Sequence, residues 1–253
     1  MPKLSINTTE NYSLNFDKKK RTFNQIKFLI FHYTGMKNEK KAINRLLDKN
    51  SKVSSHYFIK NSGEILTLVP DLYNAWHAGV SSWKNYKFLN KNSIGVEINN
   101  PGHSHKYKNF SQKQIKSIIK LSKFLIKKYK IKKYFVLGHS DVAPDRKQDP
   151  GEKFPWKYLS KYKIGYWHNL NSNFLSSKRN VKTKNLEKKV FIQNLFKIGY
   201  PNNKKIKIKK YSQIITRAFQ RRFRQELING VIDQECLLIS KNLIKKRNKN
   251  LVI

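Results

Sequence analysis

A short, nearly continuous apolar run, Ile26–Phe31, places the strongest limit on the fold of this chain. Such a run is typical of a strand that is buried on both faces of a sheet. A second run of this kind, Tyr134–Leu137, follows a segment with helical spacing of apolar residues, 111–129. Strands and helices that alternate in this way predict an α/β domain with a mixed central β-sheet flanked by helices.

The same patterns predict the remaining elements of this domain. Two strands joined by a hairpin at Asn61–Gly63, one later strand and one early helix are expected at 56–59, 64–69, 93–99 and 39–50. On the later strand Glu97 faces opposite to its apolar neighbours, so it either faces solvent or points into a cleft. Ser111 and Gln114 are spaced as a capping box for the helix that ends at Tyr129.

Changes in composition divide the chain into four parts. Residues 1–25 are polar and basic, and they form an extension that either wraps the domain or remains loose. The α/β domain spans 26–170, and the mostly polar segment 171–186 is predicted to be a linker. Beyond it, 187–253 show only helical patterns, which predicts a small all-α domain of three helices, the third capped by Asp233.

Charge and cysteine content narrow the classes of partner and site. The 253 residues carry a net charge of +39, which favours polyanionic surroundings, although a lysine-rich composition with solvated side chains would give the same value. The lysines are spread along the whole chain, so we do not expect nucleic acid as a partner. The single cysteine, Cys236, excludes an intrachain disulfide and a cysteine-based metal site.

Two of the seven histidines, His32 and His139, stand out because each ends a predicted buried strand. Strand ends in an α/β sheet meet at one rim, so these imidazoles could lie together with Asp149. Two His and one Asp, with water as fourth ligand, is a known catalytic zinc arrangement. Of the other five, we expect His103, His105 and His168 to be bystanders without a function. His56 and His77 are expected to be either structural hydrogen-bond donors or residues of a cleft.

Four motifs in this order resemble a known family: His32–Thr34, Ala75–Gly79, Ile94–Ile98 and Gly138–Pro144, the last followed by Arg146–Lys147 and Asp149–Pro150. The chain over roughly 26–160 is similar to the zinc N-acetylmuramoyl-L-alanine amidases of type 2, whose fold is shared by T7-type lysozyme and the peptidoglycan recognition proteins. The resemblance implies that 26–170 is an amidase catalytic domain. It also implies that His32, His139 and Asp149 bind Zn²⁺ and that Glu97 and Lys147 act on the substrate.

The implied reaction cleaves the amide bond between the lactyl group of N-acetylmuramic acid and L-alanine. Glu97 would move the proton of the attacking water to the leaving amine, and Lys147 would stabilise the oxyanion. Intact peptidoglycan and anhydro-muropeptide fragments both remain open as substrates. Asp145 departs from the family, whose members often carry Gly there, and its carboxylate either alters the surroundings of Lys147 or points away.

The tail resembles a second family, the three-helix peptidoglycan-binding module, at Leu195–Tyr200, Ala218–Phe223 and Gly230–Glu235. This resemblance implies anchoring to the cell wall, where a second site raises the local substrate concentration. The main alternative is a peptidoglycan-binding protein without activity, and a nucleic-acid-binding protein is the third hypothesis.

Location and assembly are less constrained. Residues 1–21 lack the apolar core of a secretory signal, and no run approaches the ~20 apolar residues of a membrane span. We therefore expect no transmembrane segment and a cytoplasmic monomer, with the periplasm or cell envelope as the alternative that a wall-binding module favours.

Overall fold

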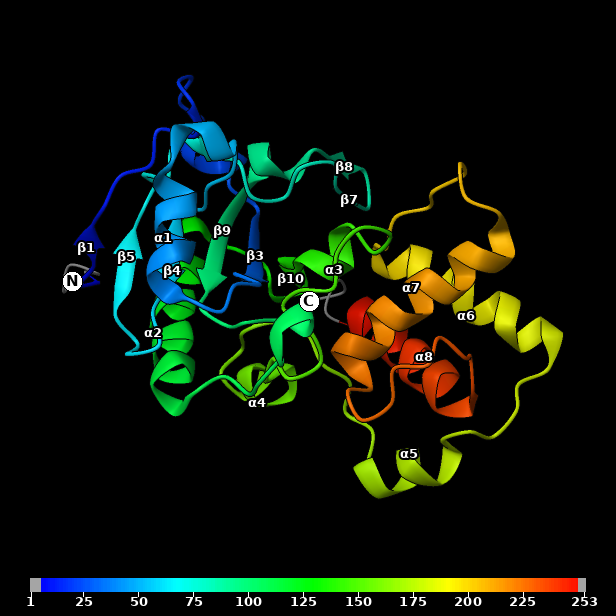
Figure 1. Cartoon of the computed structure of the whole chain (residues 1–253). Coiled ribbons are helices and arrows are strands. Elements are labelled where there is room, and N and C mark those ends of the chain that lie inside the picture. The colour runs from blue at the N-terminus through cyan, green and yellow to red at the C-terminus, as the bar shows by residue number, and fades with distance from the viewer. Residues whose placement is uncertain (1–5, 250–253) are drawn as a thin grey trace.

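The computed structural model describes residues 6–249 (Figure 1). Residues 1–5 of the predicted extension and 250–253 of the predicted helical domain lie outside the described residues. The chain folds around a six-stranded sheet with the order β1 (Thr9–Glu10), β5 (Ile65–Thr67), β4 (Tyr57–Ile59), β9 (Ser93–Ile98), β3 (Phe28–Tyr33) and β10 (Val136–Gly138). Two short pairs accompany it: β2 (Phe16–Asp17) with β6 (Asn74–Ala75), and β7 (Ser82–Trp83) with β8 (Tyr86–Lys87).

The sheet is mixed, as the sequence predicts. Strand β3 lies between β9 and β10 and runs parallel to both, whereas β5 runs antiparallel to its hairpin partner β4. Several strands are shorter than predicted. The run at Tyr134–Leu137, for example, becomes a strand only from Val136, because Lys133–Phe135 form a 3-10 turn.

Helix α2 (Gln112–Tyr129) covers one face of the sheet. The predicted capping box begins this helix: the backbone N–H of Gln114 donates to the Ser111 hydroxyl, and the Gln114 side chain accepts from the Ser111 N–H. Its apolar side packs on side chains of one parity from the central strands, in a core that includes Leu29, Phe31, Ile94, Val96, Ile98, Ile115, Ile118, Leu121 and Leu125. Removing this apolar surface from water is the main force that holds the layer together.

Different helices cover the opposite face of the sheet. Helix α1 (Glu39–Leu47) packs on β4 and β5 through Ala42 and Leu46. The C-terminal helices pack on Phe28 and Ile30, which alternate onto this face of β3. The next residue of the same parity is His32, and the cavity described below opens beside it.

The described part of the N-terminal extension wraps the domain. Strand β1 pairs with β5 at the sheet edge. Arg21 is buried, and its guanidinium donates to the backbone oxygens of Asp71, Asn90 and Ser93. A buried guanidinium needs such partners, because an unpaired one would cost several kcal/mol. The extension thus forms part of the wall behind the central strands.

Helices follow the last strand. Short helices α3 (His139–Val142) and α4 (Trp156–Lys161) precede α5 (Ser172–Lys178), which lies within the segment predicted to be a linker. The predicted three-helix unit consists of α6 (Asn185–Ile198), α7 (Ile208–Phe223) and α8 (Gln234–Lys249). Asp233 caps α8 as predicted, since its carboxylate accepts from the backbone N–H of Cys236.

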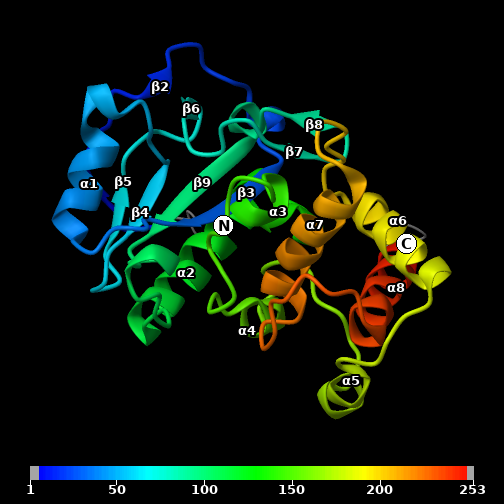
Figure 2. The ribbon, with the colours of Figure 1, turned by 45° about the vertical axis from the view of Figure 1, so that its right-hand side comes forward.

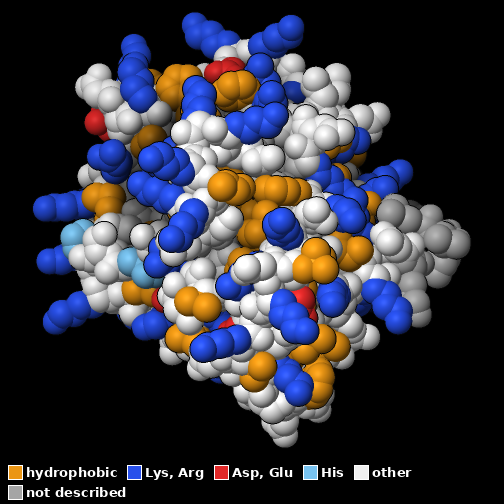
Figure 3. Space-filling view, turned by 90° about the vertical axis from the view of Figure 1, so that its right-hand side faces the viewer, with side chains coloured by type: hydrophobic (Ala, Val, Ile, Leu, Met, Phe, Trp, Pro, Cys, Tyr) orange, Lys and Arg blue, Asp and Glu red, His pale blue; other side chains and the backbone are white. Residues whose placement is uncertain are grey.

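The three-helix unit lies directly against the sheet domain (Figure 2). One continuous apolar cluster joins Phe28, Ile30 and Leu137 of the strands to Phe191, Leu195, Phe219 and Leu237 of the helices. On the face of this unit in Figure 3, Lys and Arg side chains are dispersed and few acidic ones lie between them. Within residues 6–249 no helix combines the length and apolar character needed to cross a bilayer.

Candidate metal centre and catalytic cleft

Strands β3 and β9 place His32 and Glu97 side by side. The two residues are direct partners in the parallel register of these strands. Partners in register point to the same face, so both side chains lie on the face opposite the α2 core, where Glu97 lines the cavity described below. Glu97 therefore points into a cleft, which was one of the two orientations expected from its parity.

The loop after β10 supplies the other two predicted ligands. His139 is the first residue of α3, directly after the last residue of β10. Asp149 returns to the same place because its backbone carbonyl accepts from the N–H of Ser140 at 2.8 Å. A side chain on Gly138 would meet Pro150 at 2.6 Å from its Cβ, so glycine is needed for this close return.

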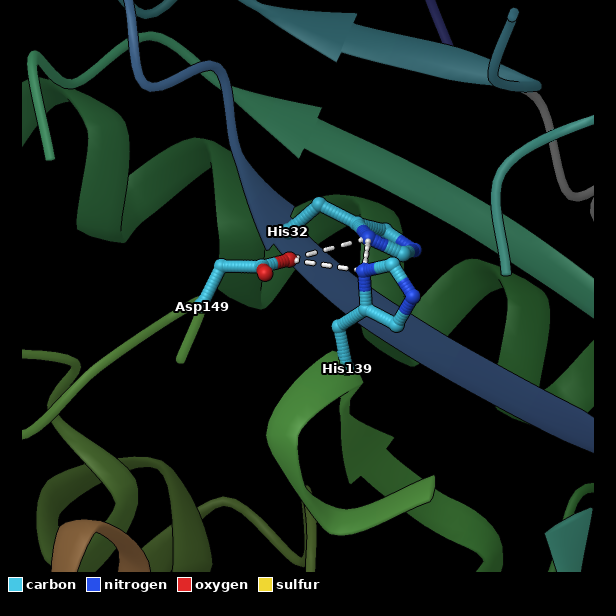
Figure 4. Close-up of side chains that lie close together, drawn as sticks. All are labelled: His32, His139 and Asp149. Carbon is cyan, nitrogen blue, oxygen red and sulfur yellow. Dashed lines mark hydrogen bonds and ion pairs between the residues drawn. The ribbon is translucent and has the colours of Figure 1, made fainter. Parts of the chain in front are cut away.

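His32, His139 and Asp149 converge on one point, as Figure 4 shows. The Nδ1 atoms of the two imidazoles lie 2.9 Å apart, and Asp149 Oδ2 lies 3.1 Å from His32 Nδ1 and 3.0 Å from His139 Nδ1. All three residues are buried. The structure thus brings together the three side chains that the sequence proposes as ligands, from positions up to 117 residues apart.

The chemistry of these three atoms fits a metal ion. His139 Nε2 lies 3.2 Å from the carbonyl oxygen of Ala78, an acceptor, so Nε2 carries the hydrogen of a neutral ring and Nδ1 offers a lone pair. An ionised Asp149 also offers only lone pairs. Acceptors about 3 Å apart repel unless a positive charge lies between them, and this spacing suits ligands of a zinc ion bound at about 2.1 Å.

The pKa values of His32 and Asp149 favour metal binding. Burial lowers the pKa of His32 to about 4, with a further decrease from His139, so the ring is neutral near pH 7. Burial also raises the pKa of Asp149, but the two neighbouring imidazoles outweigh it and hold this pKa below the ordinary value for Asp. Neutral imidazoles and a carboxylate are the forms in which these groups bind metals.

The pKa of Glu97 is shifted upward, in contrast to those of His32 and Asp149. Burial raises its pKa to about 8, the nearby carboxylate of Asp149 adds to the rise, and Lys147 opposes it. Its Oε2 is buried and has no hydrogen-bond partner among the described residues. A carboxylate with one buried, unpartnered oxygen and a raised pKa is typical of a group that exchanges protons during a reaction.

A cavity of about 410 Å³ opens beside these groups. Its wall contains Glu97, His139, Lys147 and Asp149, together with Ala42 and Leu46 of α1. His103, predicted to be a bystander, also lines this cavity, where its Nδ1 lies 2.8 Å from the hydroxyl of Tyr33. No contact of His103 with the ligand cluster follows from this position, so its bystander status stays a prediction.

Asp145 points away from the cleft. It is exposed, and its carboxylate accepts from the side-chain amide of Asn203 at 3.1 Å, in the connection between α6 and α7. Of the two possibilities left by the sequence, the structure therefore favours a carboxylate directed away from Lys147.

His56 and His77 are the residues whose part the sequence leaves undecided. Both are buried, and His77 also lines the cavity. His77 contacts His32 directly, with 3.0 Å between its Nδ1 and His32 Nε2. His56 accepts from the N–H of Gly95 and contacts Arg21. In the sequence, the only signals were that His77 lies in the Trp-His motif and that His56 lies near the start of a strand. All the hydrogen-bond partners of these two residues are distant in sequence.

Comparison with known proteins agrees with this geometry. Residues 22–152 match the family described as N-acetylmuramoyl-L-alanine amidase. The amidase AmiD of Escherichia coli K12 is 34% identical over 251 residues, which cover 94% of this chain and 89% of AmiD. The 1,6-anhydro-N-acetylmuramyl-L-alanine amidase AmpD of Haemophilus influenzae is 37% identical over 114 residues, 44% of this chain and 60% of AmpD.

Solved structures extend the similarity to the fold. The E. coli AmiD complex with its substrate anhydro-N-acetylmuramic acid-L-Ala-D-gamma-Glu-L-Lys has a TM-score of 0.80 at 32% identity, covering 91% of this chain and 93% of AmiD. AmpDh3 of Pseudomonas aeruginosa, solved with an anhydromuramic pentapeptide, has a TM-score of 0.76 at 28% identity, covering 91% of this chain and 94% of that one.

The family match ends before the three-helix unit, so wall binding by residues 187–253 stays a prediction from the sequence. The match to residues 22–152 and the similarity to AmiD over most of both chains establish that this protein belongs to the N-acetylmuramoyl-L-alanine amidase family.

Proposed function

We propose that this protein is a zinc-dependent hydrolase that cleaves the amide bond between the lactyl group of N-acetylmuramic acid and L-alanine in cell-wall recycling. The observation that carries the proposal is the convergence of His32, His139 and Asp149 at the wall of a cavity that Glu97, His139 and Asp149 line. The ligand atoms of the three lie within 4.8 Å of one another, which is close enough for a single ion.

The substrate class follows from the similar structures. AmiD was solved with an anhydro-muropeptide substrate and AmpDh3 with an anhydromuramic pentapeptide. We propose that this chain also acts on anhydro-muropeptides, and that the cavity of about 410 Å³ accepts the part of the molecule around the scissile bond.

His32, His139 and Asp149 would hold the zinc ion. When bound, zinc acts as a Lewis acid that polarises a carbonyl and lowers the pKa of a water toward about 7. Glu97, on the strand next to His32, takes one proton from the attacking water at Oε2 and delivers it to the amide nitrogen as the C–N bond breaks. A pKa raised toward the working pH suits both steps, because such a group can both accept and donate a proton.

Lys147 has a different role in this mechanism. It lines the cavity from the loop between His139 and Asp149, and its backbone N–H donates to the carbonyl of Ala143, which fixes the start of the side chain. The ammonium donates a hydrogen bond to the substrate carbonyl oxygen as that oxygen gains negative charge. Charge stabilisation of this kind favours the transition state over the bound substrate.

Removal of metal tests this function. The full chain is treated with a chelator, returned to buffer, and given an anhydro-N-acetylmuramoyl peptide with or without added Zn²⁺, and the released peptide is quantified by mass spectrometry. We expect release only after zinc is restored, because the zinc ion would supply the Lewis acid of the reaction. Release that is unaffected by zinc removal would contradict the mechanism. Binding of the muropeptide without release by the zinc-loaded protein would favour the non-catalytic alternative.

A further inference from the structure

His77 contacts the proposed zinc ligand His32 on the side that faces away from the ligand cluster. Its Nδ1 lies 3.0 Å from His32 Nε2, while His32 Nδ1 points at His139 and Asp149. The two rings meet edge to face, with their centroids 5.1 Å apart. His77 is 8% exposed, so water competes little for this contact.

Gly95 fixes the position of the His77 ring. A Cβ added at Gly95 would lie 2.4 Å from Cγ of His77 and 2.5 Å from its Nδ1, distances that real Cβ atoms do not reach. The ring therefore packs flat on the backbone of β9, where every other residue type would displace it. This glycine lies two residues before Glu97, so one strand positions both the ring and the proposed proton carrier.

In the hydrogen bonds that join Leu89, Ser93 and His77, only one assignment of donors and acceptors is consistent. The Ser93 hydroxyl donates to the carbonyl oxygen of Leu89 at 2.6 Å, and a carbonyl can only accept. The same hydroxyl lies 3.0 Å from His77 Nε2 and must accept from it, because its single hydrogen is already used. A neutral imidazole has one N–H, so His77 Nδ1 carries a lone pair.

The same argument then applies to His32. Because His77 Nδ1 is an acceptor, His32 Nε2 must be the donor in the contact between the two rings. A neutral His32 then has its lone pair on Nδ1, the atom directed at the ligand cluster. The opposite tautomer would place a hydrogen where the metal has to bind.

We propose that Leu89, Ser93 and His77 form a hydrogen-bond relay that holds His32 in its metal-binding tautomer, which makes His77 a positioning residue of the zinc site. The inference rests on the proposed function, since it assigns the relay to the zinc ligand His32. Partners that orient a ligand histidine in this way typically change metal affinity 10- to 100-fold when they are lost.

The test compares three variants of the full chain. His77→Phe keeps a flat ring over Gly95 and removes the acceptor. His77→Asn keeps an acceptor in the place of Nδ1, because Asn Oδ1 is attached to Cγ as Nδ1 is. Ser93→Ala leaves the His77 ring intact and removes the hydroxyl that determines which of its nitrogens carries the hydrogen. His168→Phe, at a buried histidine outside the cavity, is the matched control.

Zinc affinity of the metal-free proteins is measured by competition with a chromophoric chelator. We expect His77→Phe to weaken binding about 10- to 100-fold, Ser93→Ala to weaken it in the same direction, and His77→Asn and the control to stay close to the parent chain. Nitrogen NMR of the metal-free parent chain should show an unprotonated Nδ1 on His32, and this signature should be lost in Ser93→Ala.

Two results would overturn the relay and leave the proposed function standing. The first is a His77→Phe chain that binds zinc as tightly as the parent chain. The second is an equal loss of zinc affinity in His77→Asn and His77→Phe, because packing alone would then explain the loss. A parent chain that binds no zinc would overturn both the relay and the proposed function.

Discussion

Glu97 shows how the proposed role of a single residue depends on its strand partner. Its side chain lies beside His32 because the two strands are parallel and in register, and its Oε2 is left without a hydrogen-bond partner in the described chain. A buried carboxylate oxygen without a partner is costly for stability, and such a group is typical of residues that exchange protons in a reaction.

Replacement of this carboxylate is expected to stop the reaction without unfolding the protein. Glu97→Gln has nearly the same shape but cannot accept a proton, so turnover should fall about 100- to 10,000-fold. Zinc content should stay that of the parent chain, because Glu97 is not among the three clustered ligand residues. The measurement is kcat on an anhydro-muropeptide, together with metal analysis.

The matched control is Glu64→Gln at an exposed carboxylate paired with Lys60, which should leave turnover unchanged. Parent-level turnover in Glu97→Gln would remove Glu97 from the mechanism.

The raised pKa of Glu97 predicts the pH dependence of the reaction. A base works only when it is deprotonated, and a raised pKa means that the proton is retained up to a higher pH. Activity should therefore fall as pH decreases through the pKa of Glu97, which lies at about 8 before any cation is bound. Zinc favours the ionised form, so we expect the acid limb of kcat/KM between the ordinary value of about 4.3 and that value. A profile that is flat from pH 5 to 9 would contradict this role.

At the scale of elements, helix α7 holds the helix that begins with His139. The guanidinium of Arg222 donates to the carboxylate of Asp141 in α3 and to the carbonyl of Val136 at 3.0 Å. It also lies 4.2 Å above the ring of Trp156. The hydroxyl of Tyr200 donates to the other oxygen of Asp141 at 2.9 Å. A buried ion pair therefore connects the three-helix unit to the residue two positions after a proposed zinc ligand.

Removing one side of this pair should cost much of the stability of the protein. Arg222→Met leaves the buried Asp141 carboxylate without its counter-ion, a change that typically lowers the free energy of unfolding by about 3–5 kcal/mol. Denaturant unfolding of the full chain measures the change. Adding Asp141→Asn should restore part of the loss, because the uncompensated charge is then absent.

Lys209→Met, at an exposed position of the same helix, should change the free energy of unfolding by less than about 0.5 kcal/mol. An Arg222→Met chain as stable as this control would show that the ion pair contributes nothing to the junction.

At the scale of the whole molecule, the sheet domain and the three-helix unit share one apolar core. Phe28, Ile30 and Leu137 of the sheet are each at most 1% exposed, and Phe191 and Phe219 of the helices are fully buried in the same cluster. Helices attached through a continuous core behave as part of the domain, whereas a tethered module would have a polar boundary.

Truncation after residue 184 is therefore expected to destabilise the sheet domain. Loss of α6, α7 and α8 would expose the second face of β3 and β10, and exposed apolar surface costs about 25 cal/mol per Å². Thermal unfolding and light scattering of the 1–184 chain should show a lower Tm and aggregation. A truncated chain with the Tm of the full protein would mean that the two parts fold independently.

The sequence by itself determined the local elements and the identity of the proposed ligands. Apolar runs and helical spacing predict the central strands and α2, because periodicity reports which side of an element is buried. The capping box at Ser111 and Gln114 forms from neighbours in the chain. His32 and His139 could be paired because each follows a buried strand, and such strands end at a common rim.

The tertiary structure decided which surfaces meet. Periodicity shows that α6, α7 and α8 have apolar faces, but it does not show that these faces cover the sheet beside His32. The proposed role of His77 depends on its contacts with Ser93 and Gly95, and Asp145 is held away from the cleft by a hydrogen bond from Asn203. Each of these contacts joins residues 16 or more positions apart, and their pairing depends on the packing of the whole chain because no local pattern records it.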